Sequence, residues 1–355
     1  MTRILVLGGG AQGRVIAGDL SQSLPEAAVH VADVVAPPLP ARPNLRWVEA
    51  DASRPGVLEG LLKGADLVVG ALPSRLGDAA MRAAIASGTP MVDVSFAAES
   101  PLLLYDAARA AGTFLIPDCG LAPGLSHLVA GRLASEYGPP ESLTIYVGGV
   151  AQDPSAPYGY VVTWSPDDLL EEYVRPARIR RRGRPTELPV FSEREVFTIA
   201  GAGEMEAFLS DGLRTLLETL PEIPDMEEKT LRWPGHVESV QPLLREGRFV
   251  AEIRARCQSV PPRDLVVLLV RARWRDRVAE TLLLDRYDEA TGLSAMSRTT
   301  ALTTAVVAQW AARGRIRETG VLPLELLARD AAFYDFVVEE MGRRGVRVET
   351  TVGAA

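Results

Sequence analysis

Lysine is nearly absent from this chain. Of its 355 residues only Lys63 and Lys229 are lysines, so arginine supplies every other fixed cation. A lysine amine becomes a catalytic base when burial lowers its pKa, and this scarcity removes almost every candidate for that role. Cysteine is equally scarce. Cys119 and Cys257 are too few for a disulfide framework or a four-thiolate zinc site, so we expect no metal.

Long apolar runs are also missing. No stretch approaches the roughly 18 apolar residues that a membrane-spanning helix needs, and the run at residues 4–7 ends in glycines, far short of a signal-peptide core. The net charge of -8 lacks the basic excess that neutralises phosphates, which disfavours a general nucleic-acid binder. With 47% hydrophobic residues, the chain is typical of a cytoplasmic globular protein without membrane or nucleic-acid partners.

The first third of the chain alternates short apolar runs with helical patterns. The apolar runs lie at residues 4–7, 29–34, 45–50, 67–71, 91–94 and 114–116, and the helical patterns at 11–22, 57–62, 79–86 and 102–110. This alternation is typical of an α/β fold with a doubly wound parallel sheet of the Rossmann type. We therefore expect a dinucleotide-binding domain over residues 1–124.

The alternation is lost after about residue 125. Strand-like segments at 143–147, 265–272 and 280–287 mix with helical patterns at 126–137, 204–217 and 300–312, and a loop rich in glycine, proline and aromatics covers 148–160. We expect a mixed α+β substrate domain over residues 125–300, and C-terminal helices over 301–355 that pack back on the first domain. An arginine-rich run at 175–184 indicates a hairpin or subunit contact rather than a nucleic-acid site.

A glycine-rich fingerprint follows the first predicted strand. The segment Gly8-Gly9-Gly10-Ala11-Gln12-Gly13 satisfies G-x-G-x-x-G and opens a helix, as a dinucleotide site requires. Gly8 would permit the tight turn, Gly10 the approach of a pyrophosphate, and Gly13 close packing of helix on strand. The pyrophosphate would bind the N–H groups at the start of the helix, including those of Ala11 and Gln12. The alternative is a glycine-rich turn without a ligand.

An acidic residue ends the second predicted strand. Asp33 lies twenty positions after Gly13, where a carboxylate accepts hydrogen bonds from the adenosine ribose. No basic residue follows at positions 34–36 to neutralise a 2′-phosphate, which favours NAD over NADP as the cofactor. Asp51 is expected near the adenine, and the nicotinamide half is expected to border Ala71-Leu72-Pro73 at the end of the fourth strand. Asp33 could instead only cap a turn.

The segment Asp118-Cys119-Gly120-Leu121-Ala122-Pro123-Gly124-Leu125-Ser126-His127 follows the sixth predicted strand. The carboxyl ends of such strands are where catalytic groups meet a nicotinamide. Asp118 could there bind a cationic amine, or it could cap a turn. Cys119 has no basic neighbour in sequence, so it is interpreted as a small buried residue rather than a nucleophile.

The chain resembles the saccharopine dehydrogenase-like family, and most closely its lysine 6-dehydrogenase branch. The resemblance rests on the fingerprint and on four further segments, at residues 118–127, 156–166, 229–236 and 298–300. It implies a Rossmann domain joined to a mixed α/β domain that binds substrate and forms a homo-oligomer, a dimer or larger. It also implies NAD-dependent oxidative deamination of the ε-amine of L-lysine. The product would be 2-aminoadipate 6-semialdehyde, which cyclises to a piperideine carboxylate.

Two other functions remain open. One is a saccharopine or carboxynorspermidine reductase, which forms a secondary amine and needs a larger, more cationic pocket. The other is an NAD-binding protein that catalyses nothing. The reductase differs from a lysine dehydrogenase because it requires a second substrate. The non-catalytic protein differs because it transfers no hydride.

The resemblance suggests a role for each polar residue near the substrate. Asp118 would hold the ε-amine and stabilise the developing iminium cation, while His236, His127 or Lys229 would position the hydrolytic water. A second group, implied as substrate-binding, comprises Arg298, Thr299 and Thr300 for the α-carboxylate, and Tyr160, Gly159 and Thr163 as the pocket wall.

Each role has a structural alternative. The segment 298–300 could cap the helix that follows it, and His236 could cap its own helix. His127 could be a core histidine, and Lys229 could pair with the adjacent Glu227 or Glu228.

Overall fold

The computed structural model describes residues 1–97, 99–259 and 261–355. The chain divides into two compact units, each made of two separate segments. The first unit comprises Met1–Leu128 and Thr300–Arg344, and the second comprises Val129–Thr299 and Gly345–Ala355. The boundaries fall inside two helices, α5 (Leu125–Tyr137) and α10 (Ala295–Ala312). The final eleven residues thus belong to the second unit, whereas the sequence placed all of 301–355 with the first.

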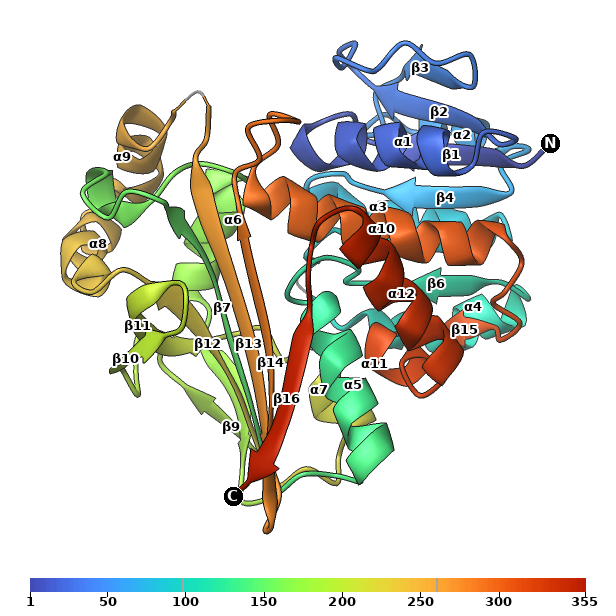
Figure 1. Cartoon of the computed structure of the whole chain (residues 1–355). Helices are drawn as coiled ribbons and strands as arrows, with labels where there is room; N and C mark the ends of the chain where they lie inside the picture. The colour runs from blue at the N-terminus through green and yellow to red at the C-terminus, as the bar shows by residue number, and fades with distance from the viewer. Residues whose placement is uncertain (98, 260) are drawn as a thin grey trace. The chain divides into compact units, whose positions relative to one another are not determined.

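The first unit contains a seven-stranded sheet in the order β15-β6-β5-β4-β1-β2-β3, with every neighbouring pair parallel (Figure 1). Its elements are β1 (Arg3–Leu7), α1 (Ala11–Ser23), β2 (Ala28–Asp33), β3 (Leu45–Glu49), α2 (Val57–Leu62), β4 (Leu67–Gly70), α3 (Ser74–Ala86), β5 (Met91–Asp93), the 3-10 helix η1 (Pro101–Leu104), α4 (Tyr105–Ala110), β6 (Phe114–Ile116), β15 (Gly320–Val321), α11 (Leu324–Leu327) and α12 (Ala331–Arg343). The predicted doubly wound Rossmann sheet is confirmed, and the order of strands reverses between β1 and β4.

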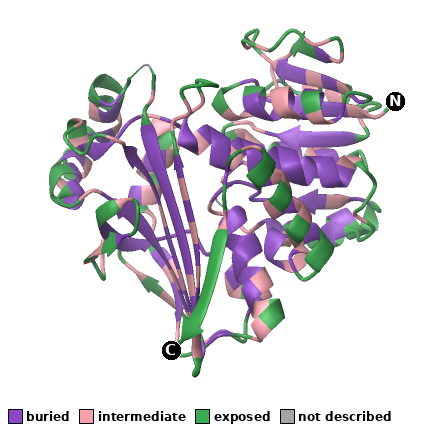
Figure 2. Ribbon diagram, in the orientation of Figure 1, coloured by how far each residue is buried: buried purple, intermediate pink, exposed green. Residues whose placement is uncertain are grey.

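Helices pack on both faces of this sheet. On one face, α2, α3 and α4 bury a core that includes Leu7, Met81 and Leu115. The central strands β1, β4 and β5 are buried almost throughout (Figure 2). On the other face, Asp19 of α1 accepts two hydrogen bonds from the Arg344 guanidinium, at 2.6 and 2.9 Å, and one from the Gln309 amide of α10. A partly buried polar cluster therefore joins the C-terminal helices to α1.

The second unit contains a mixed nine-stranded sheet in the order β10-β11-β12-β7-β13-β14-β16, with the β8–β9 hairpin attached to β12. Its elements are β7 (Ser142–Ala151), the 3-10 helix η2 (Pro157–Gly159), α6 (Pro166–Val174), β8 (Ala177–Arg181), β9 (Arg184–Leu188), β10 (Glu195–Ile199), β11 (Gly203–Ser210), α7 (Leu216–Thr219), β12 (Asp225–Arg232), α8 (His236–Arg245), α9 (Phe249–Arg256), β13 (Asp264–Arg273), β14 (Arg277–Arg286) and β16 (Glu349–Ala354). Strands β12 and β7 are parallel, and the other pairs are antiparallel.

Three predicted elements of this unit were wrong. Residues 204–217, expected as a helix, form β11 and the short α7, because β11 lies between two strands and is buried on both faces, so its apolar residues do not alternate. The predicted loop begins too early, because β7 continues through Gly148, where a Cβ would lie 2.1 Å from the Leu231 carbonyl oxygen. Residues 349–354, expected within helices, form the exposed edge strand β16 (Figure 2).

Among the described residues, no helix is both long enough and apolar enough to cross a membrane.

Candidate functional site

The glycine-rich loop between β1 and α1 is shaped by close backbone contacts. Gly8 has a φ of +96°, and a Cβ there would lie 2.5 Å from the carbonyl oxygen of Ala71. A Cβ on Gly13 would lie 1.9 Å from the carbonyl oxygen of Gly8. Both positions therefore require glycine for the turn itself. Gly10 differs, because a Cβ there would have no atom within 4 Å, so the protein alone gives no reason for a glycine at this position.

The start of α1 has the features of an anion site. The helix begins at Ala11 with Gly10 as its N-cap, and no described side chain caps it. The first N–H groups of a helix have no partner within the helix, and its dipole favours an anion at this end. The Oε1 atom of Gln12 is buried and without a hydrogen-bond partner among the described residues. The N–H groups of this first turn fit the pyrophosphate of a dinucleotide, for which Gly10 leaves open space.

Two acidic residues lie at the same edge of the sheet: Asp33 ends β2, and Asp51 follows β3. The Asp33 carboxylate accepts hydrogen bonds from the backbone N–H groups of Gly9, at 2.5 Å, and Val35, at 3.2 Å. The Asp51 carboxylate accepts bonds from the N–H and hydroxyl of Ser53, which lower its pKa. Both carboxylates therefore have turn-forming partners, and Asp33 is fastened directly to the glycine-rich loop.

The loop after β4 completes this edge. Ala71 donates its N–H to the carbonyl of Leu7 at 2.8 Å, which places the two strand ends side by side. Pro73 is the N-cap of α3, and Leu72 packs on the core beneath. The structure thus brings the predicted cofactor residues Gly8, Gly13 and Ala71 into direct proximity at the point where the order of strands reverses.

Two carboxyl groups lie at the ends of the neighbouring strands β5 and β6. Asp118 follows β6 in a left-handed conformation, with a φ of +52°, and is 6% exposed. Asp93 ends β5 and is fully buried. The Cys119 N–H donates to the Asp93 carbonyl at 2.8 Å, which fixes the segment carrying Asp118 beside β5. Burial raises the pKa of Asp93 from its ordinary value of 3.8 to about 7. The hydrogen bonds from Ser95 lower this pKa, and the charge of Asp118 raises it.

The neighbouring Cys119 and His127 have structural partners. Burial and the two nearby carboxyls raise the pKa of the Cys119 thiol, which therefore stays neutral. Its carbonyl accepts a hydrogen bond from the Thr304 hydroxyl at 2.7 Å. The Nδ1 atom of His127 lies 3.0 Å from the Ser126 hydroxyl, inside the buried start of α5.

In the second unit, His236 is part of a buried hydrogen-bonded chain. Its Nδ1–H donates to the carbonyl of Tyr158 at 2.8 Å, so its Nε2 accepts from the Tyr173 hydroxyl at 2.8 Å. The oxygen of that hydroxyl in turn accepts from Arg232 Nε at 2.7 Å. Burial and the Arg232 charge lower the pKa of His236 to about 3, so the imidazole is neutral at physiological pH. Although His236 is the first residue of α8, its ring does not cap that helix.

Lys229 is buried on β12 and has an acceptor of its own. Its Nζ donates to a carboxylate oxygen of Glu195 at 2.6 Å and to the carbonyl of Glu193 at 2.9 Å, while Glu227 lies at 4.0 Å. The ammonium therefore ties β12 to the β10 segment. A role in activating water stays a prediction, and these contacts weigh against it.

The residues predicted to line a pocket lie close to the His236 chain. Tyr160 is 3% exposed, and the Arg232 guanidinium lies 5.7 Å from the centre of its ring. Gly159 has a φ of +60°, and a Cβ there would lie 2.7 Å from Trp233. Thr163 is also buried. The structure thus groups Tyr160 and Gly159 with His236. Contact of a substrate with these two residues or with Thr163 stays a prediction.

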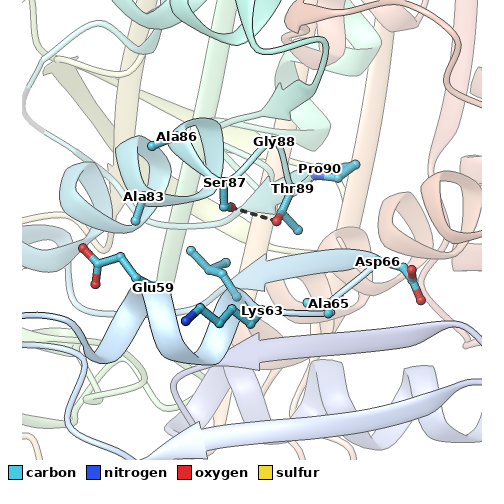
Figure 3. A pocket seen from close by; sticks show the side chains of 12 residues that line it. Glu59, Lys63, Ala65, Asp66, Ala83, Ala86, Ser87, Gly88, Thr89 and Pro90 are labelled. Carbon is cyan, nitrogen blue, oxygen red and sulfur yellow. Dashed lines mark hydrogen bonds between the residues drawn. The ribbon is translucent and has the colours of Figure 1, made fainter.

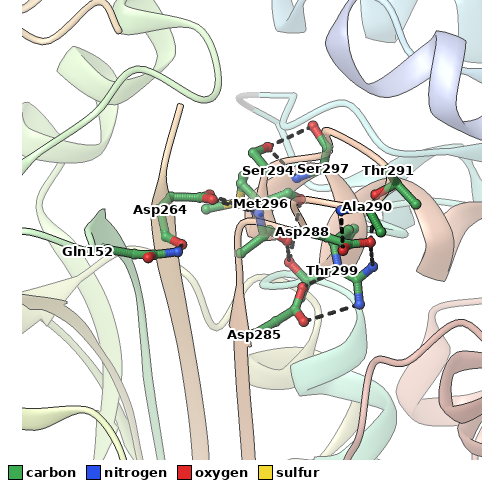
Figure 4. Close-up of polar contacts among 12 residues, drawn as sticks. Gln152, Asp264, Asp285, Asp288, Ala290, Thr291, Ser294, Met296, Ser297 and Thr299 are labelled. Atoms are coloured by element: carbon green, nitrogen blue, oxygen red, sulfur yellow. Dashed lines mark hydrogen bonds and ion pairs between the residues drawn. The ribbon is translucent and has the colours of Figure 1, made fainter. Parts of the chain in front are cut away.

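The segment 298–300 lies inside α10, which begins at Ala295, so it does not cap this helix. Figure 4 shows Thr299 on this helix. The Arg298 guanidinium pairs with both oxygens of Asp285, at 2.8 and 3.3 Å, and with Asp288 at 3.1 Å. The Thr299 hydroxyl donates to the Ala295 carbonyl at 2.8 Å.

The residue that caps α10 comes from strand β13. The Asp264 carboxylate of β13 accepts from the N–H groups of Ala295, at 2.6 Å, and Met296, at 2.9 Å. Thr300, on the next turn, accepts a hydrogen bond at its carbonyl from the Thr304 hydroxyl at 3.1 Å. The Arg298 guanidinium thus binds both oxygens of a carboxylate, but that carboxylate is Asp285 of the protein rather than the α-carboxylate of a substrate.

A cavity of about 650 Å³ lies away from these residues, between α2, α3 and the amino-terminal end of β4 (Figure 3). Its lining includes Glu59, Lys63 and Asp66, with the hydrogen-bonded hydroxyls of Ser87 and Thr89. Ligands of doubly wound sheets bind at the opposite, carboxyl-terminal edge. Lys63 lies here, and so it does not face the predicted nicotinamide edge.

Sequence reasoning missed several buried polar groups. Asp93, Arg232 and Tyr173 were not singled out, and neither was Glu228, whose pKa is raised to about 8 by burial and by the nearby Glu172 and Asp211. A signal was available only for Asp93, which ends a predicted strand at the edge that carries Asp118. The partners of the others come from distant segments.

The first unit's fold and glycine-rich loop define a Rossmann-type dinucleotide-binding protein that carries a second, mixed-sheet unit. Two family models together match almost the whole chain: the saccharopine dehydrogenase NADP binding domain over residues 4–116, and the saccharopine dehydrogenase C-terminal domain over residues 120–346. The chain belongs to the saccharopine dehydrogenase family, a family of oxidoreductases. The resemblance found in the sequence is confirmed at this level.

Individual relatives match parts of the chain. Saccharopine dehydrogenase (NADP(+), L-glutamate-forming) of Schizosaccharomyces pombe is 27% identical over 152 residues, which are 41% of this chain and 34% of that protein. Mitochondrial alpha-aminoadipic semialdehyde synthase of Mus musculus is 32% identical over 133 residues, which are 36% of this chain and 14% of that protein. The matched regions thus span about a third or less of these relatives.

A solved structure shares the fold over the full length. The apo saccharopine dehydrogenase (L-Glu forming) of Saccharomyces cerevisiae has a TM-score of 0.76 and covers 100% of both chains, at 18% identity. At this identity the likeness shows the fold alone.

Proposed function

We propose that this chain is an NAD-dependent dehydrogenase that oxidatively deaminates the ε-amine of L-lysine. The observation that carries the proposal is the placement of Asp118 beside Asp93 at the carboxyl ends of β6 and β5. In a doubly wound sheet, this edge borders the nicotinamide half of the cofactor. An acidic, largely buried edge there suits a cationic amine.

The chemistry sets clear demands on the protein. The bound nicotinamide supplies the hydride acceptor. Hydride can leave C6 of lysine only when the attached nitrogen has a lone pair, and this amine, with a pKa of about 10.4, is protonated at pH 7. Loss of that proton and then of hydride leaves an iminium cation. Water adds to its carbon, and departure of ammonia leaves the aldehyde, so that all atoms balance.

Asp118 is assigned to hold this nitrogen through the reaction. A carboxylate pairs with the ammonium of the substrate and stabilises the iminium charge that replaces it. The other predicted bases fit this role less well, because His236 is buried with both ring nitrogens hydrogen-bonded and Lys229 is paired with Glu195. We therefore assign the substrate's proton to Asp118 or to solvent, with an alkaline rate optimum as the consequence.

The cationic side chains that could bind further substrate carboxylates already pair with carboxylates of the protein. This favours L-lysine as the substrate over a compound with more carboxylates. Arg298 is held by Asp285 and Asp288, and Lys229 by Glu195. Both fixed cations among the predicted catalytic and substrate-binding residues, Arg298 and Lys229, thus have a carboxylate partner within the protein. A saccharopine-type substrate brings additional carboxylates that need such cations, whereas lysine brings one carboxylate and a cationic amine.

The cofactor assignment rests on Asp33. Its carboxylate is fastened to the glycine-rich loop through Gly9, in the position from which a strand-end acid reaches the ribose hydroxyls. A 2′-phosphate would meet this negative charge, and no basic residue follows in sequence at 34–36. We therefore propose NAD rather than NADP, with Gly8, Gly10, Ala11, Gln12, Gly13, Asp51, Ala71, Leu72 and Pro73 as the other cofactor-binding residues.

A second candidate is a saccharopine dehydrogenase, which acts on a secondary amine. The similarity to the saccharopine dehydrogenase of Schizosaccharomyces pombe favours this candidate, although the matched region covers only 34% of that protein.

The two candidates are separated by supplying one substrate at a time to the purified chain. L-Lysine with NAD alone should yield NADH and ammonia, with the rate rising toward alkaline pH. Saccharopine with NAD or NADP should yield much less reduced cofactor. Turnover of saccharopine without turnover of lysine would replace the first candidate by the second. Binding of NADH without oxidation of either amine would favour a protein that catalyses nothing.

Size-exclusion chromatography with light scattering tests the expected homo-oligomer.

A further inference from the structure

Asp93 is a buried carboxyl group with one unused oxygen. It is the last residue of β5 and is 1% exposed. Its Oδ1 accepts hydrogen bonds from both the N–H and the hydroxyl of Ser95. Its Oδ2 is buried and has no hydrogen-bond partner among the described residues. A buried ionised carboxylate needs paired or hydrogen-bonded oxygens, so this environment favours the protonated form.

Two glycines make room for this group. A Cβ on Gly70 of β4 would lie 1.8 Å from Oδ2 of Asp93, and a Cβ on Gly77 of α3 would lie 2.1 Å from the Ser95 hydroxyl oxygen. The Asp93 carboxyl and its Ser95 partner thus occupy space that ordinary side chains on β4 and α3 would fill. This packing indicates a built polar site rather than a side chain buried by chance.

The charges facing Asp93 are acidic. The hydrogen bond from Cys119 N–H to its carbonyl brings Asp118 alongside, and the thiol of Cys119 is itself neutral. In the described part of the chain, the Asp93 carboxyl makes no hydrogen bond or ion pair with an arginine or lysine. The negative charge of Asp118 raises the pKa of Asp93, and of two such interacting carboxyl groups the more deeply buried one keeps the proton.

We propose that Asp93 is a positioning residue that holds the proton of this carboxyl pair, so that Asp118 carries the single negative charge at the strand ends. The protonation of the pair follows from the geometry alone. Its consequence for a substrate amine rests on the proposed function. When Asp93 loses its proton at higher pH, a second charge adds to that of Asp118, and a cationic amine should bind more tightly.

Infrared spectroscopy of the protein without substrate tests the first part. Protonated carboxyls of Glu228 and Asp264 contribute bands of their own, so the Asp93 band is the one lost in Asp93→Asn, a variant that keeps the acceptor for Ser95. In the wild type this band should disappear near neutral pH. In Asp118→Asn it should disappear at lower pH, because the repelling charge is gone. In Ser95→Ala it should disappear at higher pH, because the hydroxyl that stabilises the anion is gone.

These opposite shifts distinguish a coupled pair from a merely structural residue. An Asp93 band absent already at pH 5, or one that does not respond to Asp118→Asn, would overturn the proposal. If Asp93→Asn fails to fold, the Asp93 band is identified instead as the one that Asp118→Asn shifts to lower pH and Ser95→Ala to higher pH.

The kinetic part is read separately, with L-lysine as the probe. In the wild type, KM should fall at least about threefold between pH 6 and pH 8.5, a range in which the amine stays protonated. In Asp93→Asn it should change less than about twofold across this range. A wild-type enzyme that does not oxidise lysine, with the infrared shifts as expected, would contradict the proposed function and leave the protonation of Asp93 standing. If lysine is oxidised and KM falls equally with pH in the wild type and in Asp93→Asn, ionisation of Asp93 does not strengthen substrate binding. The proposed function would then stand, and this part of the proposal would be overturned.

Discussion

Replacing Glu228 by glutamine should stabilise the protein at neutral and alkaline pH. Glu228 lies on β12 and is fully buried, and its Oε2 has no hydrogen-bond partner among the described residues. Its carboxyl lies against Gly212, where a Cβ would be 1.5 Å from Oε1. Burial, and then the charges of Glu172 and Asp211, raise its pKa from 4.5 to about 8.

The direction in which Glu228 changes the stability with pH follows from proton linkage. Below pH 4.5 the group is protonated in both the folded and the unfolded chain, so it carries no penalty. As pH rises from 4.5 toward 8, the unfolded chain loses this proton while the folded protein retains it, and stability falls. At pH 7 the cost is on the order of 3 kcal/mol, because each pKa unit corresponds to about 1.4 kcal/mol. Glutamine has almost the same shape and removes this cost.

The assay is urea unfolding of the wild type and of Glu228→Gln between pH 4.5 and 8, with Glu204→Gln, at an exposed position of β11, as the control. The free energy of unfolding of Glu228→Gln should exceed that of the wild type by an amount that grows with pH, and the control should show no such trend. Equal pH dependence in wild type and Glu228→Gln would refute the reasoning.

Three further predictions concern the cofactor loop and α10. Gly10→Ala should weaken NADH binding at least about tenfold without unfolding the protein. The control Gly60→Ala, equally free of neighbours in α2, should leave NADH binding unchanged. Unchanged affinity of Gly10→Ala would mean that no ligand approaches Gly10. Asp33→Asn should reduce the preference for NAD over NADP, measured as the ratio of kcat/KM values, by roughly ten- to hundredfold, and a wild type that prefers NADP would contradict the cofactor assignment. Arg298→Gln should lower the free energy of unfolding by about 3–5 kcal/mol, because it leaves Asp285 buried without its partner; a stable variant with a raised KM for the amino acid would instead restore Arg298 as a substrate ligand.

The parts of the fold that the sequence predicts are those specified locally. The glycine-rich loop follows from Gly8 and Gly13, whose contacts lie within the same β-α-β segment or at the next strand end. The parallel sheet follows from short apolar runs separated by amphipathic helices. Strand β11 was mistaken for a helix because burial on both faces removes the alternation that identifies a strand.

The side-chain partners could not be predicted in the same way. Arg298 has the chemistry of a carboxylate ligand, but its Asp285 partner comes from a strand that precedes the helix, so only the folded chain shows that the fork is occupied. Likewise, nothing near His236 in sequence indicates that Tyr173 and the Tyr158 carbonyl hold both ring nitrogens. Composition identifies groups capable of catalysis, and tertiary structure decides which of them already have partners.

Isotope transfer from labelled lysine tests the central claim most directly. L-Lysine carrying two deuterium atoms at C6 is incubated with NAD and the wild-type protein, and the reduced cofactor is analysed by mass spectrometry. If the ε-amine is oxidised, the reduced cofactor carries one deuterium, and Asp118→Asn forms almost none of it. Unlabelled NADH would place the oxidation at the α-carbon, and no reduced cofactor at all would contradict the account.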